Sequence, residues 1–297
     1  PLMRGLHRSQ PLEKLVEEAA ALGHQGVREI NVISQDTTWY GRDLRRTQGP
    51  KAPLLPDLLR ALLDGTDIPW YRLFYIYPSG VTDELVEVIA QEPRILSYLD
   101  MPLQHGSDAM LKAMRRPERR KTILSSVRSL RARVPDLTLR TTVIVGFPGE
   151  SEADFRELLD LLEEIQFDRV GAFAYSIEEG THAAAMDGHV PDSLKRERLE
   201  ELLDVQRTIS LERTLAQVGE RTRLLLDEPV SDDPEFAWMG RTESQALDVD
   251  GVTFLEAGTG DGSLALEAGR FIDVEIVDAT EHDLIARRSQ DHTNGRE

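Results

Sequence analysis

The feature that most constrains the fold of this chain is a regular alternation of helical and strand-like stretches from residue 11 to about residue 218. The helical stretches carry apolar residues at intervals of three and four, and short β-branched or aromatic runs lie between them. Helices are expected at 11–22, 56–64, 82–91, 107–115, 119–133, 152–165 and 192–217. Strands are expected at 27–34, 70–78, 96–101, 137–145 and 169–176.

Strands that are separated by helices need long crossover connections, so they pair in parallel and build an α/β sheet or barrel. Thr82 is a suitable N-cap for its helix, and Ser151 with Asp154 forms a capping-box pattern. The chain begins in a loop that leads to a helix, so we expect a preceding strand to be missing from a fragment or processed product. Six strands rather than eight would then make a partial TIM-like barrel.

The character of the sequence changes after Gly219. Short strand-like segments alternate there with Gly, Asp and Pro, which is typical of a small all-β, OB-like barrel of about 70 residues. The expected strands are 221–228, 243–250, 252–257 and 271–280. We therefore divide the chain into a first domain at 1–218, a β-barrel domain at 219–289 and a disordered tail at 290–297.

The acidic residues are concentrated in the second domain. The whole chain has a formal net charge of −18, and residues 219–289 hold 17 acidic against 6 basic residues, a net charge of −11. Such a field repels nucleic acid and attracts basic proteins. No apolar run approaches the roughly 18 residues that a membrane-spanning helix needs, and no signal-peptide pattern opens the chain.

The sequence contains no cysteine. This excludes a disulfide scaffold, a cysteine nucleophile, a thiolate zinc site and any iron–sulfur cluster that this chain would hold alone. The absence of cysteine fits a reducing cytoplasm.

Ligands of parallel α/β folds bind at the carboxyl ends of the strands, so the loops after the expected strands are the place for a site. The polar and glycine residues in these loops are Gln35, Asp36, Tyr40, Gly41, Ser79, Gly80, Gln104, His105, Ser107, Gly146, Gly149, Glu150, Ser151, Glu178, Glu179 and Thr181. They predict the mouth of an active site. No HExxH, GxSxG, P-loop or dinucleotide fingerprint occurs.

Several of these features have a structural interpretation beside the functional one. The segment 146–149 can be a tight turn or a ligand cradle, and His105 can be a hydrogen-bonded loop histidine. The basic run 115–121 can be a solvated face or a binding surface. Arg140 stands inside an otherwise apolar strand, where an unpaired charge is costly, so it should reach a ligand or an acidic partner inside the barrel.

Four strings at the strand ends together resemble the radical S-adenosylmethionine (SAM) methylthiotransferases. They are SQDTTWYG, YLDMPLQHGSDAMLKAMRR, TTVIVGFPGESEADF and VGAFAYSIEEGT, and the opening PLMRGLHRS is similar to the stretch after the CxxxCxxC motif of that family. The resemblance runs to about residue 288, with the last seventy residues similar to the TRAM domain. The first string resembles the RimO type more than the tRNA-modifying MiaB type.

The resemblance implies a barrel that binds SAM and two 4Fe-4S clusters, one of which would come from an N-terminal domain absent here. A 5′-deoxyadenosyl radical would abstract hydrogen from the β-carbon of an aspartate in the small-subunit ribosomal protein twelve, which then receives a methylthio group. The same resemblance implies a set of cofactor-binding residues: Gln35, Asp36, Gln104, His105, Arg140, Gly146, Gly149, Tyr175 and Ser176. Because the cluster cysteines are absent, we expect no metal ligand or catalytic residue in this chain and no activity of the chain alone.

Three hypotheses remain open. The first is the core of a RimO-type enzyme of the cytoplasm, whose acidic barrel binds the basic ribosomal protein. The second is part of a tRNA methylthiotransferase, which should bind RNA. The third is a catalytically inert, cysteine-free paralogue that serves as a protein-binding module.

Overall fold

The computed structural model describes residues 5–258 and 265–289 of the chain, so the tail expected at 290–297 lies outside the described residues. The chain divides into two compact units, residues 1–206 and 207–297, and this division falls within helix α8 (Asp192–Leu215). The boundary expected at residue 218 follows the end of that helix. In the described ranges, no helix is both long and apolar enough to cross a membrane.

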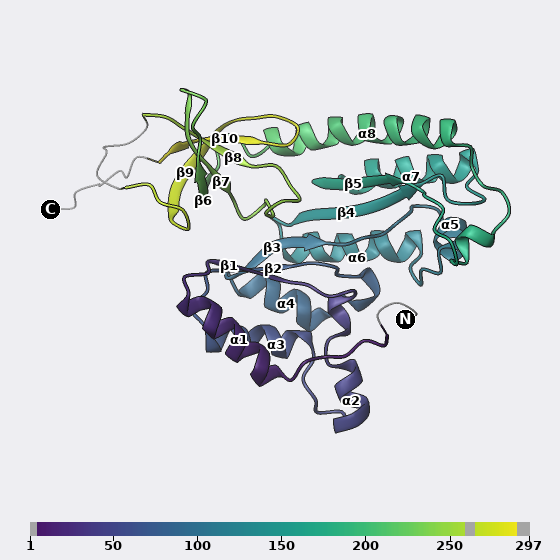
Figure 1. Cartoon of the computed structure of the whole chain (residues 1–297), viewed down its shortest axis with the longest axis horizontal. Helices are drawn as coiled ribbons and strands as arrows, with labels where there is room; N and C mark the ends of the chain where they lie inside the picture. Colours follow the sequence, from purple (N-terminus) through teal and green to yellow (C-terminus); the bar gives the residue numbers. More distant parts are fainter. Residues whose placement is uncertain (1–4, 259–264, 290–297) are drawn as a thin grey trace. The chain divides into compact units, whose positions relative to one another are not determined.

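The first unit is built on a five-stranded parallel sheet with the order β1-β2-β3-β4-β5 (Figure 1). Its strands are β1 (Glu29–Val32), β2 (Trp70–Leu73), β3 (Ile95–Asp100), β4 (Thr138–Val145) and β5 (Arg169–Ala174). The helices before and between them are α1 (Leu12–His24), α2 (Arg42–Gln48), α3 (Leu55–Gly65), α4 (Asp83–Gln91), α5 (Asp108–Ala113), α6 (Arg120–Arg133) and α7 (Glu152–Ile165). The α/β fold expected from the alternation is confirmed.

Strand β4 shows how the sheet separates an apolar face from a polar one. Leu139, Val143 and Val145 are fully buried, while Arg140 and the alternating positions after it are partly exposed. Since successive side chains of a strand point to opposite faces, one face of the sheet belongs to the core and the other is open to polar groups. Buried apolar stripes on α4, α6 and α7 supply the rest of this core.

Two local expectations for the first unit are wrong. The strand expected to reach residue 78 ends at Leu73, because Tyr75 takes a left-handed backbone with φ of 54° and a 3-10 turn, η2 (Pro78–Gly80), follows. Helix α2 lies between the strand expected at 27–34 and the helix expected at 56–64, where no helix was expected; none of its residues is buried, so it carries no apolar periodicity that the sequence could reveal. The predicted caps Thr82 and Ser151 are confirmed by hydrogen bonds to the backbone.

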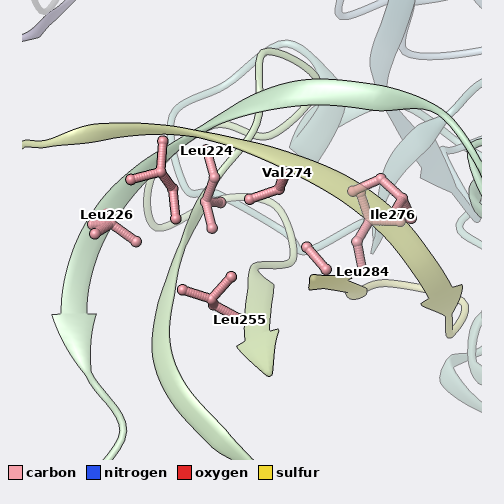
Figure 2. Close-up of a cluster of buried hydrophobic side chains, with 8 residues drawn as sticks. Leu224, Leu226, Leu255, Val274, Ile276 and Leu284 are labelled. Carbon is pink, nitrogen blue, oxygen red and sulfur yellow. The ribbon is translucent and has the colours of Figure 1, made fainter. Parts of the chain in front are cut away.

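The second unit contains a closed β-barrel with the order β10-β8-β7-β6-β9. Its strands are β6 (Arg221–Pro229), β7 (Phe236–Arg241), β8 (Thr253–Glu256), β9 (Phe271–Ala279) and β10 (Leu284–Arg288). Figure 2 shows the barrel core, in which the side chains of Leu224, Leu255, Val274 and Leu284 lie together and are at most 2% exposed. The expected small all-β barrel is therefore confirmed.

The strand expected at 243–250 is wrong, and β7 and β10 were not expected. The 243–250 segment is a series of turns, held where the Asp250 carboxylate accepts a hydrogen bond from the Ala246 N–H and where buried Gln245 bonds Thr253. The alternating Leu247 and Val249 that suggested a strand are about half exposed, so the alternation does not mark a buried strand face. β7 contains Gly240, which lowers the strand signal but is required, because a Cβ there would lie 2.2 Å from the Leu225 carbonyl oxygen.

Truncation of Leu255 tests the barrel core. Leu255→Ala removes a side chain that is 2% exposed and leaves a cavity, so it should lower the free energy of unfolding of the barrel by about 2–5 kcal/mol. Urea unfolding, with hydrogen exchange of the barrel amides, measures this loss. The control Leu247→Ala alters a side chain that is 48% exposed and should change little. Equal effects of the two substitutions would contradict the assigned core.

Candidate functional site

The open face of the sheet carries a charged pair at the carboxyl end of β3. Arg140 of β4 and Asp100 of β3 lie side by side in the register, and Arg140 Nη1 donates to Asp100 Oδ1 at 2.8 Å. Asp100 Oδ2 also accepts from the Tyr75 N–H at 3.3 Å. Arg140 thus has the acidic partner that its place in an apolar strand predicts, and 18% of its side chain stays exposed on this face.

A second, buried charged group lies on the same sheet. The guanidinium of Arg72 donates from Nε to Glu29 Oε1 at 2.7 Å and lies 4.5 Å above the ring of Tyr98. Arg72 is fully buried, so its charge is neutralised by Glu29 rather than by water. The charges on this sheet are therefore compensated within the protein, and of the two arginines only Arg140 keeps some exposure.

Gln35 and Asp36 lie on the loop after β1, at one edge of the sheet. Gln35 is exposed. Asp36 is the N-cap of the 3-10 turn η1 (Thr37–Trp39), where its Oδ1 accepts from the Thr38 backbone N–H at 3.0 Å and from the Thr38 hydroxyl at 2.6 Å. Burial raises the pKa of Asp36, which outweighs the lowering by these hydrogen bonds. Asp36, which was predicted to bind the cofactor, therefore uses its carboxylate to cap the turn at Thr37–Trp39.

A buried carboxylate, that of Glu150, joins three segments at the end of β4. Glu150 Oε2 accepts from the Gly146 N–H at 2.8 Å and lies 3.2 Å from His105 Nε2. Glu150 Oε1 accepts from Arg198 Nη1 of α8 at 2.7 Å. All three charged or titratable side chains are buried, so each depends on the others for compensation.

His105 has both ring nitrogens engaged within the protein. Its Nδ1 accepts from the Ser107 N–H at 3.0 Å, which assigns the proton to Nε2, where it is donated to Glu150. The ring is fully buried. In this arrangement His105 orients the loop between β3 and α5. It is thus a hydrogen-bonded loop histidine, one of the two interpretations that the sequence allows.

The two glycines of the 146–149 segment differ in what surrounds them. Both have positive φ, 72° for Gly146 and 85° for Gly149. A Cβ on Gly146 would lie 2.4 Å from Lys195 Cγ of α8, so close packing requires glycine there. At Gly149 no atom lies within 4 Å of such a Cβ, and its N–H donates to the Gly188 carbonyl at 2.9 Å. The segment is thus a tight turn with open space at Gly149.

Tyr175 and Ser176 follow β5. The Tyr175 ring packs edge-on against Phe147 at 5.2 Å between centroids, and Lys195 Nζ lies 5.5 Å from its centroid. The Tyr175 hydroxyl is buried, and among the described residues it has no hydrogen-bond partner. Ser176 is exposed and its hydroxyl donates to Glu178 at 3.3 Å. Tyr175 therefore holds a buried hydroxyl whose hydrogen-bonding capacity is unused within the described residues.

The end of β4 borders a hollow of about 260 Å³. Gln104 reaches this hollow with a left-handed backbone of φ 76°, and its N–H and carbonyl bond Thr142 and Ile144 of β4. Its lining includes Gln104, Met114, Arg115, Arg116, Ile144 and Phe147.

Asp154 joins the start of α7 to the loop before α5. Its carboxylate accepts from the hydroxyls of Ser107 and Ser151, each at 2.5 Å, and from the Ser151 N–H at 3.0 Å. Burial alone would raise the pKa of Asp154, but these hydrogen bonds outweigh it and hold the pKa below the ordinary value. Asp154 thus stabilises the same pair of loops as Glu150.

The structure brings together Gln104, His105, Gly146 and Tyr175 around the end of β4, whereas Gln35 and Asp36 lie after the edge strand β1. Sequence reasoning missed the roles of Glu150, Asp100, Arg198 and Lys195. Glu150 stood among the loop residues with no signal of burial, and the charged helix α8 offers too many cations for two of them to stand out.

The residues present do not fit an iron–sulfur cluster. The sequence has no cysteine, and residues 5–258 and 265–289 contain no group of three or more His, Asp or Glu side chains placed to hold a metal ion. A cluster of this kind needs thiolates, so this chain cannot supply its ligands.

Residues 2–162 match the sequence profile of the Radical SAM superfamily, and residues 218–288 match that of the TRAM domain. The chain is 44% identical over 290 residues to the ribosomal protein uS12 methylthiotransferase RimO of Symbiobacterium thermophilum, covering 98% of this chain and 58% of that protein. It is 45% identical over 287 residues to the protein of the same name from Anaeromyxobacter sp., covering 97% and 59%. The chain thus spans about three fifths of these relatives.

Among solved structures, coproporphyrinogen III oxidase (HemN) from Escherichia coli, described as a radical SAM enzyme, is similar to this chain with a TM-score of 0.48 and 14% identity. That similarity covers 68% of this chain and 46% of the other.

Neutralising Glu150 tests the buried cluster. Glu150→Gln keeps the shape of the side chain but removes the buried carboxylate that pairs with buried Arg198 at 2.7 Å, so the free energy of unfolding should fall by about 3–5 kcal/mol. Urea unfolding measures the change. The control Glu152→Gln alters an exposed carboxylate 3.5 Å from the same guanidinium and should have little effect. A Glu150 variant as stable as this control would contradict the buried cluster.

Asp154 should make stability depend on pH. Asp154→Asn should lower the free energy of unfolding at neutral pH by about 1 kcal/mol, as expected for a weakened cap. Because the folded-state pKa lies below 3.8, the wild-type advantage is complete above that value and is lost as the pH falls through the lower, folded-state pKa. Urea unfolding of both proteins from neutral to acid pH tests this. A difference that persists at the lowest pH would contradict it.

Proposed function

The chain belongs to the radical SAM superfamily, and from this premise we propose that it is the part of a RimO-type methylthiotransferase that carries the SAM-binding barrel and the TRAM-like barrel. The complete enzyme would add a methylthio group to the β-carbon of an aspartate in ribosomal protein uS12. The observation that carries this proposal is the similarity to proteins of that name, which runs through both units at 44% identity over 98% of the chain.

Because the chain has no thiolate, we propose that the iron–sulfur clusters, two in the complete enzyme, are held by residues outside this sequence. The chain by itself would then be inactive. The same absence of cysteine is what favours the alternative of an inert, protein-binding paralogue. In a complete enzyme the first unit would position the cofactor. In an inert paralogue, only the β-barrel of the second unit would have a function, the binding of a protein.

The residues of this chain would position SAM, which supplies the radical chemistry when it is bound. Tyr175 is the best supported of the predicted cofactor contacts, since its buried hydroxyl has no partner in the described part of the chain. The side chain of Arg140, which pairs with Asp100, is 18% exposed, and Gly149 leaves open space at the turn. Gln35, Asp36, Gln104 and Ser176 complete the proposed contacts, whereas His105 and Gly146 would act by fixing the loops.

The TRAM-like barrel would dock the basic substrate protein. Its net charge of −11 opposes RNA and attracts a cationic protein. A groove of about 550 Å³ on this barrel places Glu235 and Asp278 beside the apolar side chains of Phe236 and Ile285. The one cation among the described residues that line this groove, Arg287, is paired with Glu256 at 2.7 Å. Such a mixture of carboxylates and apolar surface suits segments rich in Lys and Arg. Since ribosomal proteins are assembled in the cytoplasm, we place the enzyme there.

Comparison of two labelled ligands tests the choice between a protein and an RNA substrate. Purified 297-residue chain should bind uS12 more tightly than a tRNA, and the binding should weaken as salt screens the charges. The double variant Glu235→Gln, Asp278→Asn should weaken uS12 binding by about three- to tenfold. The double variant Glu17→Gln, Glu18→Gln on α1 removes the same charge elsewhere and should not. Fluorescence anisotropy measures both affinities, and preferential tRNA binding would contradict the proposal.

A further inference from the structure

Two arginines beside the hollow at the end of β4 have no acidic partner. In the described ranges Arg115 makes no hydrogen bond, ion pair or ring contact through its side chain, and Arg116 only stacks over the ring of Tyr77 at 4.7 Å. Their neighbours in the same basic run are engaged: Arg119 donates to the carbonyls of its own loop, and Arg120 pairs with Glu164. The basic run is therefore not uniform: Arg119 and Arg120 are engaged, whereas within the described residues Arg115, Arg116 and Lys121 form no hydrogen bond or ion pair through their side chains, and of these three only Arg115 and Arg116 line the hollow.

The backbone at Arg115 gives an independent reason to expect a function for its side chain. Helix α5 ends in a Schellman motif, in which the Arg115 N–H bonds the Lys112 carbonyl at 3.0 Å and the Arg116 N–H bonds the Leu111 carbonyl at 2.8 Å. Arg115 takes the left-handed position of this motif, with φ of 59°, where glycine is the favoured residue. An arginine there strains the helix end, and such strain is typical of functional positions.

The rest of the hollow is suited to a short acidic group. Met114, Ile144 and Phe147 supply apolar walls, and Gln104 adds an amide at the carboxyl end of the sheet. Two guanidinium groups on an apolar wall favour an anion with an aliphatic stem, because each can form charge-assisted hydrogen bonds with a carboxylate.

We propose that this hollow binds a carboxylate on a short aliphatic stem, with Arg115 and Arg116 as its cationic partners. Two molecules of the proposed reaction carry such a group: the aspartyl side chain of the protein substrate and the amino-acid end of SAM. The proposal rests on the proposed function only for the choice between these two sources.

Titration calorimetry of the 297-residue chain with short peptides tests the proposal. A basic peptide with one central aspartate should bind about tenfold more tightly than the same peptide with asparagine, because a charge-assisted hydrogen bond is lost in the latter. Arg115→Gly and Arg116→Ala should each weaken binding of the aspartate peptide by about tenfold and leave the asparagine peptide unaffected. Lys121→Ala, which removes the same charge from the basic run outside the hollow, should change neither affinity.

Arg115→Gly also separates a binding role from a structural one. Glycine relieves the left-handed backbone, so this variant should unfold at a higher urea concentration while it loses the carboxylate preference. If Arg115 served only to stabilise the end of α5, the variant would unfold at a lower urea concentration and keep the preference. That second pattern would overturn the proposal.

A competition arm identifies the source of the carboxylate. Displacement of the aspartate peptide by SAM, but not by decarboxylated SAM, would assign the hollow to the cofactor, and no displacement would assign it to the substrate. Equal binding of the two peptides, unaltered binding by the arginine variants, or no binding of any carboxylate probe would overturn the proposal. A chain that prefers tRNA to uS12 yet distinguishes the two peptides would refute the proposed function and leave the hollow intact.

Discussion

The carboxylate of Glu150 is the point on which the geometry of the strand-end loops depends. It is buried, and it holds the backbone of Gly146, the imidazole of His105 and the guanidinium of Arg198 at once. These groups belong to three separate segments, so the turn after β4, the loop before α5 and helix α8 are fixed relative to one another by one side chain. A buried ion pair contributes little net stability but a strong geometric preference, because every other arrangement leaves a charge uncompensated.

The two units use charge in opposite ways. On the sheet of the first unit, Arg72 with Glu29 and Arg140 with Asp100 form closed pairs, so these charges are compensated within the protein and held in one arrangement. The barrel of the second unit carries a large acidic excess. An unbalanced charge of this size acts over distance and attracts a cationic partner before contact. Compensated pairs hold side chains in one arrangement, whereas an uncompensated excess of charge attracts an oppositely charged partner.

The sequence predicted the features that follow a periodic or local pattern, and it missed single contacts between residues far apart in the chain. The five parallel strands and the Thr82 and Ser151 caps follow from periodicity and from local hydrogen-bonding chemistry, which need no knowledge of distant residues. The role of Arg198 depends on a carboxylate 48 positions away and has no local signal. The same holds for β7 and β10, since pairing rather than composition makes them strands. For the candidate site, the loops could be predicted, but not which of their polar groups are already bonded within the protein.

Closure of the β-barrel restricts how a partner can be recognised. β10 completes the ring by pairing with β8 on one side and β9 on the other, so each of the five strands already has two hydrogen-bonded neighbours. A peptide therefore cannot join this barrel as an added strand, as it does where a sheet has an open edge. Recognition then depends on side chains and on the loops between the strands, and its specificity can change by surface substitution while the hydrogen-bonded framework stays as it is.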